Sequence, residues 1–142
     1  MDTYEILTRL NDAYLASLDE LEKINIDELT TYKDWEPIDA LLDRFERLID
    51  FLFQQVFRKI YIQENLQQPK TARETLLFMG KIWVVPDIGK MIDLKDLRNK
   101  IAHEYLSAYM VDLEEILDSI KFSKDFIQQV IENAATYLKK SW

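Results

Sequence analysis

Residues 37–64 read PIDALLDRFERLIDFLFQQVFRKIYIQE, and this run sets the architecture of the chain. Apolar side chains recur in it at spacings of three and four residues, which is the period of one face of an α-helix. They are Ile38, Leu41, Phe45, Leu48, Leu52, Val56 and Ile60. The spacing predicts one long helix that reaches Glu64, roughly 40 Å at 1.5 Å per residue. Phe51, Phe53 and Phe57 widen the apolar face, so we expect this helix to contact more than one neighbour.

Start signals place this helix and the one before it. Asp34 is expected to cap the long helix, and Pro37 suits its first turn. A first helix is predicted from about Thr3 to Ile24, because leucines and a tyrosine recur there at spacings of three and four. Residues 25–32 then form a polar connection between the two helices.

Two shorter helices are expected to follow the long one. Residues 71–74 read Thr-Ala-Arg-Glu, a capping-box signature, and predict a third helix through about Met79, which Gly80 ends. Asp87 or Asp93 is expected to cap a fourth helix. Its predicted inward row is Leu94, Leu97 and Ile101.

The last predicted helix runs to Leu138. Asp112, with Glu115 three residues later, is expected to open it, and Lys139 and Lys140 complement the dipole at its end. Together these segments predict an all-α fold, an antiparallel up-and-down bundle of four to five helices with short connections. Residues 1–142 are expected to form a single domain.

Composition excludes several classes of site. The chain has no cysteine and one histidine, which excludes disulfides and disfavours a structural zinc site. Neither a signal peptide nor a long apolar span is visible, so a cytoplasmic protein with no membrane contact is expected. The net charge of -8 disfavours non-specific binding to long nucleic acid, although a local basic site remains compatible with it. A small, shape-selected RNA or a basic protein partner fits this charge.

The only histidine lies in Leu97-Arg98-Asn99-Lys100-Ile101-Ala102-His103-Glu104-Tyr105. Arg98 and His103 are separated by about 140° around a helix and about 7.5 Å along it, so they can flank one groove. Asn99 and His103 share a face, and Asn99 could orient the imidazole or bind a phosphate oxygen. Cleavage of RNA without metal needs a base, an acid and a cation that stabilises the phosphorane. Histidine suits the first two roles and arginine the third.

One histidine per chain leaves the second proton carrier open. If acid and base are both imidazoles, the second comes from another copy of the chain, which favours a symmetric homodimer. Water or Lys100 could act in its place.

An arginine followed by a polar residue, a histidine five positions after it and a tyrosine two beyond resembles the signature of the HEPN-domain superfamily. The motif is most similar to that of HepT-type toxins, which are encoded beside small nucleotidyltransferases. The resemblance covers the whole chain in length and helix order, and residues 98–105 at the level of single residues. It implies a helical bundle, often dimeric, that cleaves RNA, with tRNA one candidate substrate, and needs no cofactor or metal. Arg98 and His103 would be catalytic with Asn99 beside them, and the partner nucleotidyltransferase, as antitoxin, would transfer AMP to Tyr105.

Other interpretations of the same residues remain open. The chain could be a non-catalytic subunit that presents a nucleotide or substrate to a nucleotidyltransferase, or a helical interaction module. Arg98 could pair with an acid on its own helix, Asp93 or Asp96, and Tyr105 could pack in the core. The group Phe51, Phe53 and Phe57 is expected to be core or dimer surface rather than a base-stacking platform. The acidic residues Asp43, Glu46 and Asp50 are expected to be a solvated face rather than a metal site.

Overall fold

A computed structural model describes residues 1–104 and 113–139 of the chain. Every regular element in these two ranges is helical, which confirms the predicted all-α bundle. The elements are α1 (Thr3–Leu21), the 3₁₀ turn η1 (Ile26–Glu28), α2 (Tyr32–Phe51), the π-helical turn η2 (Leu52–Val56), α3 (Phe57–Asn65), α4 (Ala72–Lys81), α5 (Ile88–Glu104), α6 (Leu113–Phe122) and α7 (Lys124–Leu138). None of them is long and apolar enough to cross a membrane.

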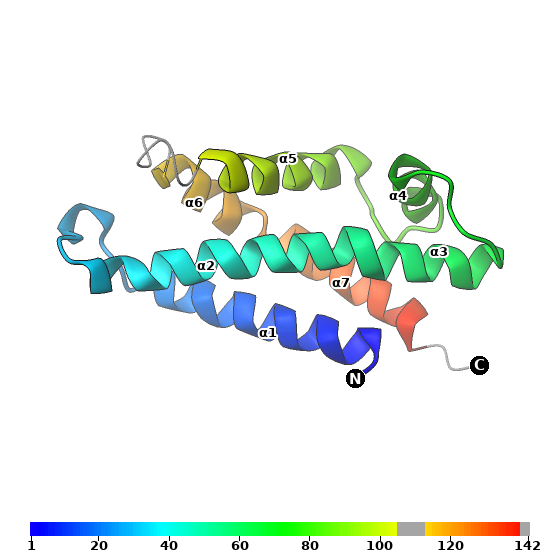
Figure 1. Ribbon diagram of the computed structural model, residues 1–142, viewed down its shortest axis with the longest axis horizontal. Coiled ribbons are helices and arrows are strands. Elements are labelled where there is room, and N and C mark those ends of the chain that lie inside the picture. Colours follow the sequence, from blue (N-terminus) through cyan, green and yellow to red (C-terminus); the bar gives the residue numbers. More distant parts are fainter. Residues whose placement is uncertain (105–112, 140–142) are drawn as a thin grey trace.

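The elements α2, η2 and α3 form one continuous helical ribbon across the middle of the molecule (Figure 1). This is the long helix predicted from residues 37–64, and it ends at Asn65. One of its turns is wider than an α-turn, because the Phe57 amide donates to the Leu52 carbonyl, five residues back. The helix contacts α1, α5 and α7, as its wide apolar face predicts.

The start of α2 corrects the predicted cap. Thr31 is the N-cap, and its hydroxyl accepts a hydrogen bond from the Asp34 amide at 3.3 Å. The Asp34 carboxylate accepts in return from the Thr31 amide at 2.9 Å. Asp34 is therefore the third residue of a capping box, and Pro37 lies in the second turn. The helix begins earlier than predicted because this reciprocal pair gives the Thr31 and Asp34 amides side-chain acceptors at its first turn.

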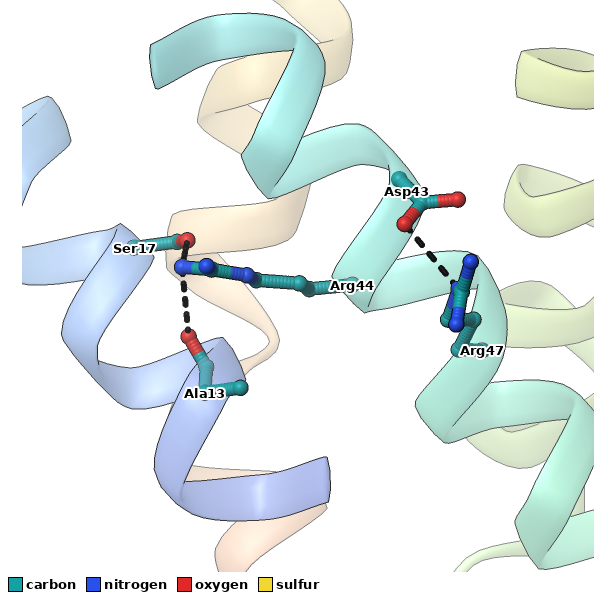
Figure 2. Close-up of polar contacts among 5 residues, drawn as sticks. All are labelled: Ala13, Ser17, Asp43, Arg44 and Arg47. Carbon is teal, nitrogen blue, oxygen red and sulfur yellow. Dashed lines mark hydrogen bonds and ion pairs between the residues drawn. The ribbon is translucent and has the colours of Figure 1, made fainter. Parts of the chain in front are cut away.

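Helix α1 lies antiparallel to α2 along its length (Figure 1). It ends at Leu21, three residues before the predicted end. A polar bridge joins the two helices: Arg44 Nη1 donates to the Ser17 hydroxyl at 2.6 Å and lies 3.5 Å from the Ala13 carbonyl (Figure 2). Between the helices, Tyr14 is fully buried with its ring 6.3 Å from that of Phe45. The core is thus centred on the face of α2 that periodicity predicted.

Helix α4 begins at the predicted cap and runs past the predicted stop. The Thr71 hydroxyl accepts from the Glu74 amide at 3.0 Å, while the Glu74 carboxylate accepts from the Lys70 amide at 2.8 Å and from the Tyr61 hydroxyl at 2.6 Å. Gly80 lies inside the helix instead of ending it. A side chain there would stand 2.7 Å from Ile88 Cδ1, so glycine permits the close approach of α5.

The last predicted helix is two helices, α6 and α7, with Ser123 between them. The Ser123 hydroxyl donates to the Ser119 carbonyl at 2.7 Å, a contact that bends helices. Sequence periodicity missed this break because the apolar face continues on both sides of it. Asp112 and Lys140, expected near the two ends, lie outside the described residues.

Candidate functional site

Helix α5 carries the motif residues and is fixed by its cap and its apolar face. The Asp87 carboxylate accepts from the Lys90 amide at 3.1 Å, so Asp87 rather than Asp93 caps the helix. Leu94 and Ile101 are buried and Leu97 is partly buried, as the predicted inward row requires. This orientation leaves Arg98 and Asn99 half-buried and places His103 in the exposed last turn.

Arg98 pairs with Asp50 on α2, not with Asp93 or Asp96 on its own helix. Arg98 Nε lies 2.7 Å from Asp50 Oδ1, and Arg98 Nη2 donates to Asp50 Oδ2 at 2.8 Å. The third nitrogen, Nη1, lies 3.5 Å from the amide oxygen of Asn99. One hydrogen bond and one ion-pair contact join the two side chains, so Asp50 orients Arg98 as well as neutralising it.

The Arg98–Asp50 pair is less exposed than the Arg47–Asp43 pair, which lies within α2. The Arg98 and Asp50 side chains are 27% and 34% exposed, whereas those of Arg47 and Asp43 are 68% and 59% exposed. Arg47 Nε lies 3.0 Å from Asp43 Oδ2, and Figure 2 shows both side chains projecting from α2. The expectation of a solvated acidic face therefore holds for Asp43 and is wrong for Asp50.

Burial and charge shift two groups at this crossing of α2 and α5. The hydrogen bond that Arg98 donates to Asp50 raises the pKa of Arg98 further above its ordinary value, so the guanidinium keeps its charge. Burial raises the pKa of Glu46, and the negative charges of Asp50 and Asp43 add to this, while Arg98 opposes it. The site thus holds one permanent cation beside a carboxylate that is protonated more easily than usual.

An open groove of about 500 Å³ lies between η2, the start of α4 and α5, and we call it the η2–α5 groove. Arg98 and Asn99 line it, together with Asp50 from the end of α2. His103 is not among its lining residues and lies one turn further along α5 than Asn99. The structure therefore brings Arg98 and Asn99 together at the groove and places His103 beyond it on the same helix.

The lining of the groove includes residues that the motif did not indicate. Arg58, Lys70 and Lys95 add three cations, and Phe53 adds an aromatic ring. Lys95 stands three residues before Arg98, which places both on one face of a helix. This spacing could have identified Lys95 from the sequence as a neighbour of Arg98. No sequence signal predicts that Arg58, Lys70 and Phe53 lie beside α5.

The aromatic group of the long helix is divided between the core and the groove. Phe57 is fully buried, as predicted for a core residue, and Phe51 is partly buried against the core. Phe53 is half-buried, lines the groove and meets the Phe57 ring edge-on with centroids 5.5 Å apart.

Two expectations from the sequence concern metal and modification. Among residues 1–104 and 113–139, no group of three or more histidine or acidic side chains is arranged to hold a metal ion. Tyr105, the candidate for modification, lies outside the described residues.

Comparison of the chain with protein-family models, with curated proteins and with solved structures finds no match.

Proposed function

We propose that this chain is a metal-independent endoribonuclease of the HEPN type, the toxin of a pair with a nucleotidyltransferase antitoxin. One observation carries the proposal: Arg98 and Asn99 line an open groove, and His103 is exposed one turn further along the same helix. Two of the three residues expected to act together thus line the groove, and the third is exposed one turn beyond it on α5.

The chemistry assigns each side chain a role. His103 takes the proton from the 2′-hydroxyl or donates one to the leaving 5′-oxygen. Arg98 stabilises the charge of the phosphorane, and Nη1 is the guanidinium nitrogen not bonded to Asp50. Asn99, four residues before His103, orients the imidazole or holds a phosphate oxygen. A second imidazole, if the reaction uses one, comes from a second copy of the chain.

The test is RNA cleavage by the purified chain in the presence of a chelator. The expected products end in a 2′,3′-cyclic phosphate or its hydrolysis product. His103→Ala should abolish cleavage, and Arg98→Ala should lower the rate about 10²–10³-fold through loss of one preorganised charge. Arg47→Ala is the matched control, since it also removes an arginine from a pair with an aspartate but is exposed on α2.

Full cleavage by both the His103→Ala and Arg98→Ala chains would assign the activity to another site or to a contaminant. No cleavage of tRNA or messenger RNA by the unaltered chain would select the alternative, a non-catalytic subunit that binds a nucleotide beside a nucleotidyltransferase. The basic lining of the η2–α5 groove is the observation that favours this alternative.

Regulation is proposed to act at Tyr105, two residues after His103. An attached AMP would bring an anion that competes with RNA phosphate for Arg98. Mass spectrometry after incubation with ATP and a nucleotidyltransferase encoded beside this chain should show additions of one AMP, absent in Tyr105→Phe. An unmodified mass, or modification at another residue, would reject Tyr105 as the regulated group.

A further inference from the structure

The η2–α5 groove concentrates positive charge in a chain whose net charge is -8. Four basic side chains line it, Arg58, Lys70, Lys95 and Arg98, against one acidic side chain, Asp50. Within the described part of the chain only Arg98 of the four forms an ion pair. Of the remaining three, Lys70 acts electrostatically on the Glu74 carboxylate, so Arg58 and Lys95 are the cations whose contacts in the described part of the chain are with uncharged groups.

Two of these cations are held in place by uncharged partners. Arg58 Nη2 donates to the Gln68 side-chain oxygen at 2.8 Å, and Lys95 Nζ lies 5.3 Å from the centre of the Phe53 ring. Such partners restrict a long side chain without neutralising it. Elsewhere, the exposed Lys23 and Arg47 instead pair with carboxylates. The groove therefore presents cations that are both preorganised and available to an anion.

The remaining lining suits a nucleotide better than a bare anion. A volume of about 500 Å³ lies in the usual range of small-molecule sites and exceeds what a single phosphate needs. Gln54 and Asn99 line the same groove with amide groups, which match the donors and acceptors on the edge of a base. Phe53 adds an apolar surface to the same lining.

We propose that the η2–α5 groove is a nucleotide-binding site in which Arg58, Lys70 and Lys95 contact phosphate. The nucleotide is either free or one unit of a single RNA strand, since both offer the same phosphate and base. This binding does not depend on the cleavage chemistry, in which none of these three cations has a role.

Binding is measured with the full chain carrying His103→Ala, in chelator, so that RNA stays intact. The ligands are AMP and a single-stranded RNA of about ten nucleotides, a length that spans a site of this size with free ends. Lys95→Gln and Arg58→Gln should each weaken binding about tenfold, as expected for one lost charge-assisted contact. For the RNA, each should also reduce the slope of log affinity against log salt by about 0.7.

Lys90→Gln is the matched control. Lys90 is on the same helix as Lys95 and also lies over an aromatic ring, that of Phe126 at 5.8 Å, but it does not line the groove. It should leave both the affinity and the salt slope unchanged. Far-UV circular dichroism of each variant checks that the helices are intact.

The outcomes distinguish a free nucleotide from an RNA strand as the ligand, and the binding site from the ribonuclease activity. Groove-dependent binding of AMP identifies a free nucleotide as sufficient, and groove-dependent binding of RNA alone identifies a strand; either result supports the site. No binding of either ligand at millimolar concentration overturns it, as does an equal loss in Lys90→Gln. Groove-dependent binding without cleavage by the unaltered chain keeps this site and rejects the ribonuclease. Cleavage of RNA by the unaltered chain, without any binding of AMP or RNA that depends on Lys95 and Arg58, keeps the ribonuclease and rejects this site.

Discussion

At the scale of single residues, the chain has two arginine–aspartate pairs that differ in exposure and in their contribution to the structure. Exposed pairs such as Arg47–Asp43 typically stabilise a protein by only about 0.3–0.5 kcal/mol. The Arg98–Asp50 pair is less exposed and joins α5 to α2 through one hydrogen bond and one ion-pair contact, so loss of one partner leaves a partly buried charge without compensation. Asp50 therefore ties the orientation of the candidate catalytic arginine to the packing of the bundle.

Glu46, beside this pair, yields a prediction about pH. Burial raises its pKa above the ordinary value of 4.5 in the folded protein. The folded state therefore binds the proton more tightly than the unfolded state, and this favours folding fully below pH 4.5. The contribution is lost as pH rises through the raised pKa. Glu46→Gln should consequently increase the free energy of unfolding at pH 7 and reduce its decline above pH 4.5.

Urea denaturation at several pH values between 4 and 7 measures this effect. Glu132→Gln, an exposed position on α7, should leave the pH dependence unchanged. A Glu46→Gln chain that is less stable than the parent at pH 7 would mean that attraction to Arg98 outweighs the burial of Glu46.

At the scale of elements, local signals predicted most of the helices. The long helix, the Thr71 cap and the choice of Asp87 as one of two possible caps depend on residues close in sequence, and periodicity and capping chemistry describe these well. The Thr31 cap was missed because its partner, Asp34, itself has a good capping side chain, and Pro37 seemed to mark a later first turn. Nothing local showed that Gly80 continues a helix, since its role is to admit Ile88.

The candidate site was predictable in part for the same reason. Arg98 and Asn99 were found because they belong to one short motif. Asp50 and Arg58 lie far from that motif in sequence, and only the packing of the long helix beside α5 brings them to the same groove. The pairing of Arg98 with Asp50 was missed because helix spacing offers nearer acids on α5 itself.

The capping box of α2 makes a prediction about stability. Thr31→Ala removes the hydroxyl that accepts from the Asp34 amide, so it should lower the free energy of unfolding by about 1 kcal/mol. Thr30→Ala is the control, because the Thr30 hydroxyl lies 3.4 Å from the Asp34 carboxylate and caps no helix amide. Urea denaturation with an unchanged slope measures the difference. Equal effects of the two substitutions would show that the Thr31 cap contributes nothing measurable.

At the scale of the whole molecule, one imidazole per chain favours a composite site. We therefore expect a homodimer in solution, with the exposed ends of two α5 helices facing one cleft. Sedimentation at micromolar concentration should give twice the mass of 17.0 kDa. A monomer that still cleaves RNA would contradict the composite site and assign the second proton transfer to water or Lys100.

The wide turn η2 has a consequence for how relatives of this chain should be aligned. A π-turn holds one residue more than the α-turn it replaces, and the helix on either side keeps its apolar face toward the core. It is how a helix absorbs a single inserted residue without rotating its far half by about 100°. A homologue with a regular helix here would be one residue shorter between Ile49 and Ile60. An alignment without this one-residue gap would pair Arg58 with the wrong position. It would then not show whether the homologue also has a basic residue at this place in the groove.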